Sequence, residues 1–516
     1  MSDSDCPSVR AGDGASEADL FLDGSAGRAA YAAAIDRARD AVLAAHADHE
    51  GPYSGASEAD LRAALLDPLP EDGTGLAAAV EEARECVLDD SVIASDPACA
   101  AHLQCPPLIP ALAAEVLLTA VNQSLDSWDQ APAATVVEER LVGALCDLFG
   151  YPGGADGVFT ASATQSNLQG FLLARNRFVA ETFGHDPQTA GLPPAAGRMR
   201  VLCSDRAHFT AEQAAALLGL GEESVVSVAT DDAGRMVPAA LDRRIEALTD
   251  RGLYLFALIG TAGTTDLGAI DPLAALAKRA SAHDLWFHVD AAYGGALALS
   301  DARSDRLAGI ERADSLAVDF HKLFFQPLSC GAFLLRDGTE FDRIARSAAY
   351  LNPEGDAVPN LVGKSLQTSR RFDALKPYLT FRALGRERLA TLVEDTLDLA
   401  AAVGERVAAA SDLELVAEPS LTTVVFRYLP DGDHPDLGDD AWADRCNRAI
   451  RDRLLADGDA VVARTELDGR AYLKLTLLDP RPTVADVGGL LDRVRERGAG
   501  IDPGDGREAG EGVAGE

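Results

Sequence analysis

Short apolar runs alternate with helical patterns through the middle of the chain. Six such runs are expected to be strands: Met199–Cys203, Ser224–Val228, Leu253–Ile259, Trp286–Val289, Ser315–Val318 and Gly331–Leu335. Between several of them, apolar residues recur with helical spacing, as at Ala211–Leu218, Pro238–Leu248 and Pro272–Ala282. This alternation predicts an α/β fold with a mostly parallel sheet.

The regions on either side have other patterns. Ala29–Ala47 and Gly75–Leu88 are alanine-rich and helical in spacing, and they predict a helical arm without a core of its own. A long helical segment at Tyr378–Ala410 precedes four strands and a helix, expected at Leu413–Val416, Thr422–Arg427, Asp440–Leu455, Ala460–Arg464 and Tyr472–Leu477. This order predicts a second, smaller α+β domain.

A chain of 516 residues is too long for one simple core. We expect an acidic leader and N-terminal helical dimerisation arm at 1–105, a large domain at 106–395, a small C-terminal domain at 396–497 and a disordered tail at 498–516. Met1–Asp19 is also expected to be disordered, because it is small, polar and acidic.

The charge balance narrows the set of partners. Acidic residues outnumber basic ones by 82 to 46, which gives a formal net charge of −36. Such a charge disfavours nucleic acid and anionic lipid, because phosphate binding needs the opposite sign. It is typical of halophile surfaces, so it predicts a halophilic host and a loss of stability at low salt.

No apolar run is long enough to span a membrane, and Met1–Asp19 lacks the basic and apolar regions of a signal peptide, so we expect a cytoplasmic protein. The eight cysteines form no Cys-x-x-Cys pair and match no zinc-site spacing. We therefore expect buried, reduced thiols and no metal site.

The strongest chemical signal is Asp314–Phe325, which reads DSLAVDFHKLFF and places His321 and Lys322 just past an apolar strand. A lysine that attacks an aldehyde cofactor must be held rigidly and be partly deprotonated, and a strand end followed by an aromatic turn can provide this. Taken alone, a His-Lys pair is more often a surface pair.

Asp290 gives the second signal, since it ends an apolar strand in Trp286–Gly295, WFHVDAAYGG. A carboxylate buried there needs a cationic partner such as a pyridinium nitrogen, and small residues after it let a flat ring approach. The alternative is a strand-end aspartate that caps the next turn.

Two further segments precede helical patterns. Gly157–Gly170 carries small and hydroxyl residues before a helix, which suits phosphate binding, although an ordinary helix cap has the same pattern. His208, in Ser204–Thr210, follows a strand and could stack on a ring or be structural.

Together and in this order, these segments resemble the group II pyridoxal-phosphate-dependent decarboxylases, over roughly Ala101–Asp479. TAGTTDLGAID at Thr261–Asp271 adds to the resemblance. It implies the fold type I, aminotransferase-like architecture, with pyridoxal phosphate bound in the large domain and a homodimer whose N-terminal arms cross the interface. The implied activity is that of a carboxy-lyase, which converts an amino acid to an amine and CO2.

The resemblance also assigns roles to residues. Lys322 would hold the cofactor as a Schiff base, Asp290 would partner the pyridine nitrogen, and His208 would stack on the ring and assist proton transfer. The remaining expected cofactor contacts are Ala163 and Thr164 at the phosphate, His321 and Asp319 beside them, Thr265, and Ala292 beneath the ring.

Within the family, Asn122–Glu138 and Tyr350–Lys376 look most like L-2,4-diaminobutyrate decarboxylases, which implies 1,3-diaminopropane as the product. The expected substrate contacts are Asp126, Trp128, Asp129, Tyr350 and Arg371. Two acidic groups would suit the second ammonium of this substrate, although both are also plausible as surface or capping residues.

The sequence departs from the family pattern in two places. Ser162-Ala163 replaces the usual Gly-Gly of the phosphate loop, and Asn352–Lys364 lacks the tyrosine that reprotonates the α-carbon in some members, with Tyr350 the nearest. Three alternatives stay open: an aromatic-amino-acid or glutamate decarboxylase, a lyase or aminotransferase of the same fold, and a catalytically dead regulatory protein.

Overall fold

The computed structural model describes residues 20–353, 355–431 and 437–501. Its central sheet has the strand order β1-β7-β6-β5-β4-β2-β3. The strands are β1 (Asp156–Thr160), β2 (Met199–Ser204), β3 (Val225–Val228), β4 (Tyr254–Thr261), β5 (Trp286–Asp290), β6 (Ser315–Asp319) and β7 (Gly331–Leu335). Five neighbouring strands from β6 to β3 are parallel, whereas β7 runs antiparallel to both β6 and β1. The expected α/β fold with a mostly parallel sheet is therefore confirmed.

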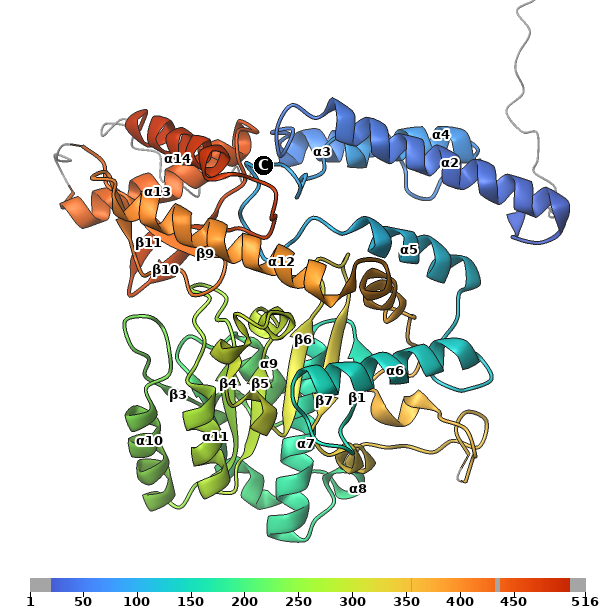
Figure 1. Cartoon of the computed structure of the whole chain (residues 1–516), viewed down its shortest axis with the longest axis vertical. Helices are drawn as coiled ribbons and strands as arrows, with labels where there is room; N and C mark the ends of the chain where they lie inside the picture. The colour runs from blue at the N-terminus through green and yellow to red at the C-terminus, as the bar shows by residue number, and fades with distance from the viewer. Residues whose placement is uncertain (1–19, 354, 432–436, 502–516) are drawn as a thin grey trace, which may run out of the picture.

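Helices cover both faces of this sheet (Figure 1). On one face, Leu258 and Leu316 pack with α6 (Pro132–Leu148), α10 (Pro238–Asp250) and α11 (Leu273–Ala282). On the other face, alternate strand residues pack against α7 (Ala163–Phe183) and α9 (Thr210–Leu217). Burial on both faces explains why these strands are continuous apolar runs in the sequence.

Strand β1 was not expected from the sequence, which indicated only a phosphate loop from Gly157 onward. The strand is five residues long, and its Gly157 has no side chain to contribute to an apolar pattern. A Cβ at Gly157 would lie 2.6 Å from the carbonyl oxygen of Phe333 on β7. Close pairing with β7 requires this glycine and at the same time weakens the strand signal.

The C-terminal domain is built on an antiparallel sheet of order β10-β11-β9-β8. Its strands are β8 (Leu413–Leu415), β9 (Thr423–Tyr428), β10 (Ala463–Leu467) and β11 (Arg470–Thr476). Strand β10 begins three residues later than Ala460, where we expected a strand. Val461 instead exchanges backbone hydrogen bonds with Ala98 and Ala100, so the chain before β10 pairs with the N-terminal region.

Helices α13 (Asp439–Ala456) and α14 (Val484–Ala499) complete this domain, and α12 (Leu375–Ala408) joins it to the central domain, since Leu389 to Leu397 pack in the central core and Leu399 to Val407 in the C-terminal core. Helix α12 contains Gly385 at φ 74°, where two helical segments meet at a kink. A capping box of Thr483 and Asp486 starts α14. The helix continues to Ala499, past residue 498 where the tail was expected to begin, and 502–516 lie outside the described residues, as do 1–19.

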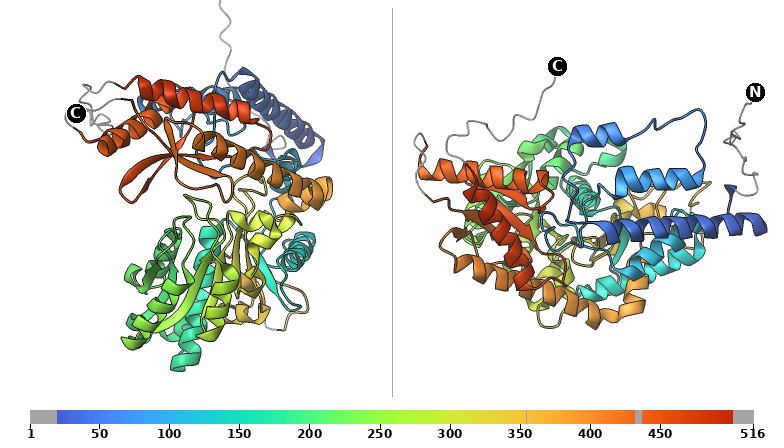
Figure 2. Two further views of the ribbon diagram at one scale, coloured as in Figure 1. Left: turned by 60° about the vertical axis from the view of Figure 1, so that its left-hand side comes forward. Right: turned by 90° about the horizontal axis from the view of Figure 1, so that it is seen from above.

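The N-terminal arm consists of α2 (Gly24–Asp48), α3 (Glu58–Ala64), α4 (Leu76–Ala83) and the π-helical turn η1 (Arg84–Leu88). Figures 1 and 2 show it on the same side of the central domain as the C-terminal domain, projecting beyond it. The arm contributes few buried residues, and large apolar side chains such as Phe21, Leu43 and Leu66 are exposed on it. Few of the described residues of the arm are therefore buried, and its role in dimerisation stays a prediction.

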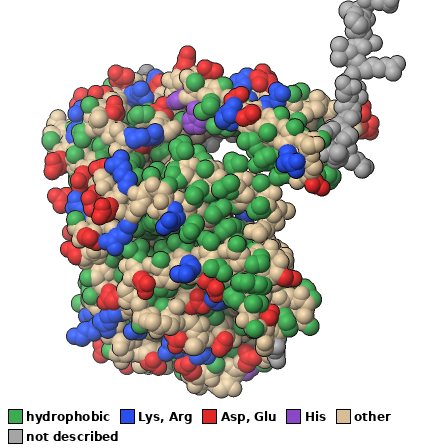
Figure 3. Space-filling view, turned by 45° about the vertical axis from the view of Figure 1, so that its right-hand side comes forward, with side chains coloured by type: hydrophobic (Ala, Val, Ile, Leu, Met, Phe, Trp, Pro, Cys, Tyr) green, Lys and Arg blue, Asp and Glu red, His purple; other side chains and the backbone are tan. Residues whose placement is uncertain are grey.

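Hydrophobic side chains also gather on the face below the arm (Figure 3). Helix α5 (Ile109–Val121) exposes Ile109, Leu117 and Val121, and α6 adds the exposed Val136. We refer to these exposed residues of α5 and α6 as the α5–α6 face. Exposed apolar surfaces of this kind occur at protein interfaces, at membrane contacts and in ligand grooves.

The remaining helical elements are short connections: α8 (Pro187–Ala190), η2 (Pro194–Arg198), η3 (Glu222–Ser224), η4 (Gly294–Leu299), η5 (Ser304–Leu307), η6 (Ile310–Arg312), η7 (Gly338–Arg343) and η8 (Leu361–Lys364). Every helix in the described part of the chain is too short or too polar to cross a membrane.

Candidate active site

A cavity opens where the central strands end. Asp290 and Asp319 are the last residues of β5 and β6, and the first turn of α7 faces them. Eight of the nine expected cofactor contacts line this one cavity, which we call the Lys322 cavity: Ala163, Thr164, His208, Thr265, Asp290, Ala292, Asp319 and Lys322. Ligands of open α/β sheets bind at this edge, beyond the carboxyl ends of the strands.

Lys322 points toward a buried carboxylate. Its Nζ lies 3.0 Å from Oδ2 of Asp319, whose Oδ1 accepts a hydrogen bond of 2.7 Å from the backbone N–H of Ala163. Asp319 therefore joins the lysine to the start of α7. As an anion it cannot attract a phosphate, so its place in the cavity is that of an orienting group for Lys322 and the helix.

Asp290 is also held on both carboxylate oxygens. Oδ2 accepts a hydrogen bond of 2.8 Å from the side chain of Asn167 on α7, and Oδ1 accepts one of 3.1 Å from the backbone N–H of Ala292. Asn167 is buried and lies one helical turn after Ala163, on the same side of α7. Asn167 was not among the site residues predicted from the sequence, although it follows the predicted Ala163 by one helical turn.

His208 stands between β2 and α9 and is partly exposed to the cavity. Its Nδ1 lies 3.0 Å from the hydroxyl oxygen of Thr210. Burial lowers the pKa of His208, and the nearby Asp290 and Asp319 carboxylates oppose that shift. The imidazole is therefore predominantly neutral near pH 7 and able to take up or give a proton.

Small side chains and the start of a helix line part of the cavity. Ala163, Ala292 and Ala317 pack together as a small group of buried side chains. The N-cap Ser162 makes no side-chain cap hydrogen bond to α7. Helix N–H groups beyond Ala163 are thus available to an anionic group such as a phosphate.

His321 does not line the cavity. Its side chain is buried beneath it, with Nδ1 2.9 Å from the carbonyl oxygen of Cys330 and Nε2 3.6 Å from Asp319 Oδ2. The C-terminal domain closes the other side, because the buried hydroxyl of Tyr293 lies 2.7 Å and 2.8 Å from those of Thr422 and Thr423.

None of the five expected substrate contacts lines the Lys322 cavity of the described chain. Asp126 is buried and accepts a hydrogen bond from the N–H of Ser127, while Asp129 accepts one from the Ser127 hydroxyl. Tyr350 is 87% exposed. Arg371 is exposed and pairs with Glu115 on α5 at 3.0 Å.

The two stretches that resemble diaminobutyrate decarboxylases pack against each other. The N–H of Leu125 donates to the carbonyl of Arg370, and the N–H of Trp128 donates to the side chain of Asn360. Arg370 is the anchor, since its buried guanidinium donates to both carboxylate oxygens of Glu138 at 2.8 and 3.0 Å. Its neighbour Arg371 was the arginine predicted from the sequence, and the buried Arg370–Glu138 pair was not predicted.

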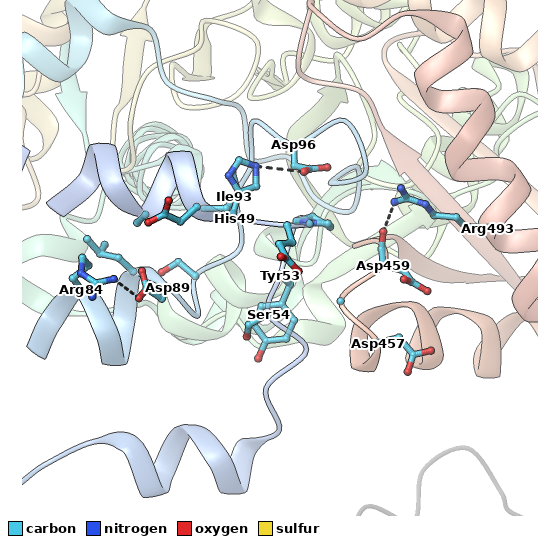
Figure 4. Close-up of a pocket in the computed structure, with 18 residues that line it drawn as sticks. His49, Tyr53, Ser54, Arg84, Asp89, Ile93, Asp96, Asp457, Asp459 and Arg493 are labelled. Atoms are coloured by element: carbon cyan, nitrogen blue, oxygen red, sulfur yellow. Dashed lines mark hydrogen bonds and ion pairs between the residues drawn. The ribbon is translucent and has the colours of Figure 1, made fainter. Parts of the chain in front are cut away.

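A second, wider cavity lies away from these residues, between the arm and the C-terminal domain (Figure 4). His49 and Asp96 lie 3.5 Å apart on one side of it, and Arg84 pairs with Asp89 at 2.6 Å. None of the site residues predicted from the sequence lines this second cavity.

Comparison with known proteins agrees with the geometry. The model of the pyridoxal-dependent decarboxylase conserved domain matches residues 60–429. The chain is 45% identical over 478 residues to the L-2,4-diaminobutyrate decarboxylase of Rhizobium meliloti (strain 1021), with 92% of each chain covered. It is 38% identical to that of Acinetobacter baumannii, with 90% of this chain and 92% of the other covered.

A solved structure gives the same result. The glutamate decarboxylase domain of diaminobutyrate-pyruvate transaminase and L-2,4-diaminobutyrate decarboxylase from Vibrio parahaemolyticus superimposes with a TM-score of 0.84 at 37% identity, covering 93% of this chain and 98% of that one. With its lysine, strand-end aspartate and histidine brought together in one cavity, this chain belongs to the pyridoxal-dependent decarboxylase family.

Proposed function

We propose that the substrate is L-2,4-diaminobutyrate, which the enzyme converts to 1,3-diaminopropane and CO2 with uptake of one proton. The observation that carries this proposal is similarity over nearly the whole length to two diaminobutyrate decarboxylases. It extends through Asn122–Glu138 and Tyr350–Lys376, the two stretches that pack against each other beside α5 and α6.

The residues of the Lys322 cavity fit pyridoxal phosphate. When bound, this cofactor accepts the electron pair that remains on the α-carbon after CO2 leaves. Lys322 would hold it covalently, Asp290 would keep its ring nitrogen protonated, and the first turn of α7 would hold its phosphate. The small side chains of Ala163 and Ala292 provide clearance for the ring.

A proton must also reach the α-carbon. His208 and Lys322 line the cavity and can each carry a proton there, whereas Tyr350 lies outside it. Water must be limited during this step, and Tyr293, hydrogen-bonded to the C-terminal domain, closes the rim of the cavity.

We also propose a homodimer. The support is the exposed apolar surface of the arm and of the α5–α6 face, which a second copy would cover. The 122–130 segment, with Asp126 and Asp129, directly follows α5, so it borders this face. We infer that a carboxylate of this segment reaches the Lys322 cavity of the second copy across such an interface; Asp129 is exposed in the single chain, whereas Asp126 is buried. Light scattering at high salt tests the dimer, and an active monomer would contradict it.

The substrate proposal is tested with a panel of amino acids assayed at high salt for both CO2 and amine. L-2,4-diaminobutyrate should give the highest kcat/KM, with equal amounts of CO2 and 1,3-diaminopropane. A preference for glutamate or an aromatic amino acid would contradict the assignment of L-2,4-diaminobutyrate as the substrate. Formation of a keto acid would indicate an aminotransferase. A cofactor spectrum that no amino acid changes would indicate a regulatory protein. The cytoplasmic location and the halophilic host stay predictions from the sequence.

A further inference from the structure

A line of hydrogen bonds runs from the core of the central sheet toward the site. The indole Nε1 of Trp286 donates to the hydroxyl of Ser315 at 2.9 Å, and that hydroxyl lies 2.7 Å from Nδ1 of His288. Nε2 of His288 lies 2.9 Å from Oδ1 of Asn167. All four side chains are buried, and none of them lines the cavity except Asn167.

At Asn167 the line divides. Its Nδ2 donates to Asp290 Oδ2 at 2.8 Å and to the hydroxyl of Thr210 at 3.1 Å. The Thr210 hydroxyl lies 3.0 Å from Nδ1 of His208. One amide therefore contacts both the partner of the cofactor nitrogen and, through one hydroxyl, the histidine that faces the ring.

The chemistry of the groups sets the direction of every bond. An indole N–H only donates, so Ser315 accepts from Trp286 and keeps its own proton free to donate to Nδ1 of His288. Nε2 of His288 then carries the ring proton and donates to Asn167 Oδ1. At the other end a carboxylate only accepts, so Asp290 independently requires the same orientation of the Asn167 amide.

The tautomer of His208 is set in the same way, through the hydroxyl of Thr210. Because Thr210 receives a hydrogen bond from Asn167, its hydroxyl proton is free to donate to Nδ1 of His208, and the backbone N–H of Thr210 approaches the same nitrogen at 3.4 Å. With Nδ1 accepting, the proton of the neutral imidazole resides on Nε2, away from Thr210.

The surroundings of His288 are shaped for this role. A Cβ at Gly170 would lie 2.7 Å from His288 Nδ1, so only glycine at this position of α7 lets the helix approach the ring. Burial lowers the pKa of His288 to about 4, which agrees with a neutral imidazole whose two nitrogens play different parts. Ala163, Asn167 and Gly170 thus share the side of α7 that faces the site.

We propose that Asn167, oriented by His288, is a positioning residue that fixes the Asp290 carboxylate and the tautomer of His208 together. The inference rests on the proposed function only in that the cavity binds pyridoxal phosphate, and it does not depend on which amino acid is the substrate. Asn167, which takes no part in the reaction itself, would then fix both the orientation of the Asp290 carboxylate and the ring nitrogen of His208 that carries the proton.

The test compares the full-length wild type with Asn167→Leu in two measurements that need no turnover. In Asn167→Leu, the Kd for pyridoxal phosphate should rise about 10- to 150-fold, the range for a lost hydrogen bond to a charged group. The ¹⁵N signals of His208 should change from one tautomer to a mixture. Thr210→Val should change the His208 signals while altering the Kd much less, because it breaks only that branch.

Asn176→Leu is the matched control, because Asn176 is an equally buried asparagine on α7 whose side chain donates to the carbonyl of Arg343 instead. It should leave both measurements unchanged. At the other end, His288→Phe should reproduce Asn167→Leu, and His288→Gln, which retains a donor, should restore the wild-type values. If Asn167→Leu is unstable, the His288 pair provides the same comparison.

Wild-type values for both Kd and His208 tautomer in folded Asn167→Leu or His288→Phe would overturn the inference. Equal changes in Asn176→Leu would also overturn it, since they would reduce the effect to general disturbance of the helix. A wild type that binds the cofactor but prefers another amino acid would contradict the proposed substrate alone.

Discussion

The amine of Lys322 and the carboxylate of Asp319 lie 3.0 Å apart, three residues from each other in the chain. Asp319 is fixed because it is the last residue of β6 and is bonded to the start of α7. The lysine is therefore directed into the cavity by the end of a buried strand rather than by a flexible loop.

Lys322→Ala should abolish both turnover and the absorbance band of the covalently bound cofactor. The chain has five lysines, and Lys322 is the one that lines the cavity in the described residues. Lys278→Ala, at an exposed position of α11, should keep the band and the activity. Absorbance after removal of free cofactor checks this, and a covalent band that survives in Lys322→Ala would contradict the assignment.

Acid should destabilise the protein in part through His288. Its pKa falls from the ordinary 6.5 to about 4 in the folded state because the ring is buried. Above pH 6.5, His288 is neutral in both the folded and the unfolded chain and does not lower the free energy of unfolding. It declines as the pH falls toward 4, because the unfolded chain binds a proton that the folded protein excludes.

Between pH 7.5 and pH 5, His288 should lower the free energy of unfolding by about 2 kcal/mol. Denaturant unfolding of wild type and His288→Phe at constant high salt should show it as a smaller pH dependence in the variant. Taking the difference between the two proteins removes the effect of the many carboxylates. Identical slopes would mean that His288 titrates normally in the folded protein.

The parts of the fold and of the site that were predicted from the sequence are those determined by residues close together in the chain. Apolar runs identified β2 to β7. Asp290, expected at a strand end, and Asp319, expected from the family resemblance, both line the cavity. Strand β1 was missed because Gly157 serves a contact with β7 that is distant in the chain. For the same reason the start of β10 was misplaced, since Val461 pairs with Ala98 and Ala100.

Polar residues that act through distant partners were the main omission. Asn167 has the spacing of a site residue, but its contacts to His288 and Asp290 become visible only when α7 lies on the sheet. Arg370 and Arg371 are adjacent and chemically alike, and only the fold shows which of them is buried.

These two arginines should differ sharply when substituted. Arg370→Met leaves the buried carboxylate of Glu138 without its partner, which should reduce the free energy of unfolding by about 3–5 kcal/mol. Arg371→Met removes a surface ion pair and should cost about 1 kcal/mol or less. Chemical denaturation measures both. A large rise in KM for Arg371→Met without loss of stability would instead support the substrate contact expected from the sequence.

Substrate selection should depend on Asp126 or Asp129. The second ammonium group of L-2,4-diaminobutyrate is costly to desolvate without an acidic partner. Asp126→Asn or Asp129→Asn should therefore raise KM for this substrate far more than for a neutral amino acid. A hydrogen bond to a charged group corresponds to about 1.5–3 kcal/mol, or roughly a 10- to 150-fold change. Equal small effects on all substrates would remove both residues from the site.

The route by which the carboxylate reaches the substrate can be tested with mixed dimers. In the described chain Asp126 lies outside the cavity that contains Lys322, so we expect it to act across the proposed interface. Co-expression of Lys322→Ala with Asp126→Asn should then restore one site that has both Lys322 and Asp126, with wild-type KM and up to half the wild-type kcat per mixed dimer. If Asp126 acts within its own chain, no mixed dimer contains a complete site, and KM for L-2,4-diaminobutyrate will stay at the value of Asp126→Asn alone.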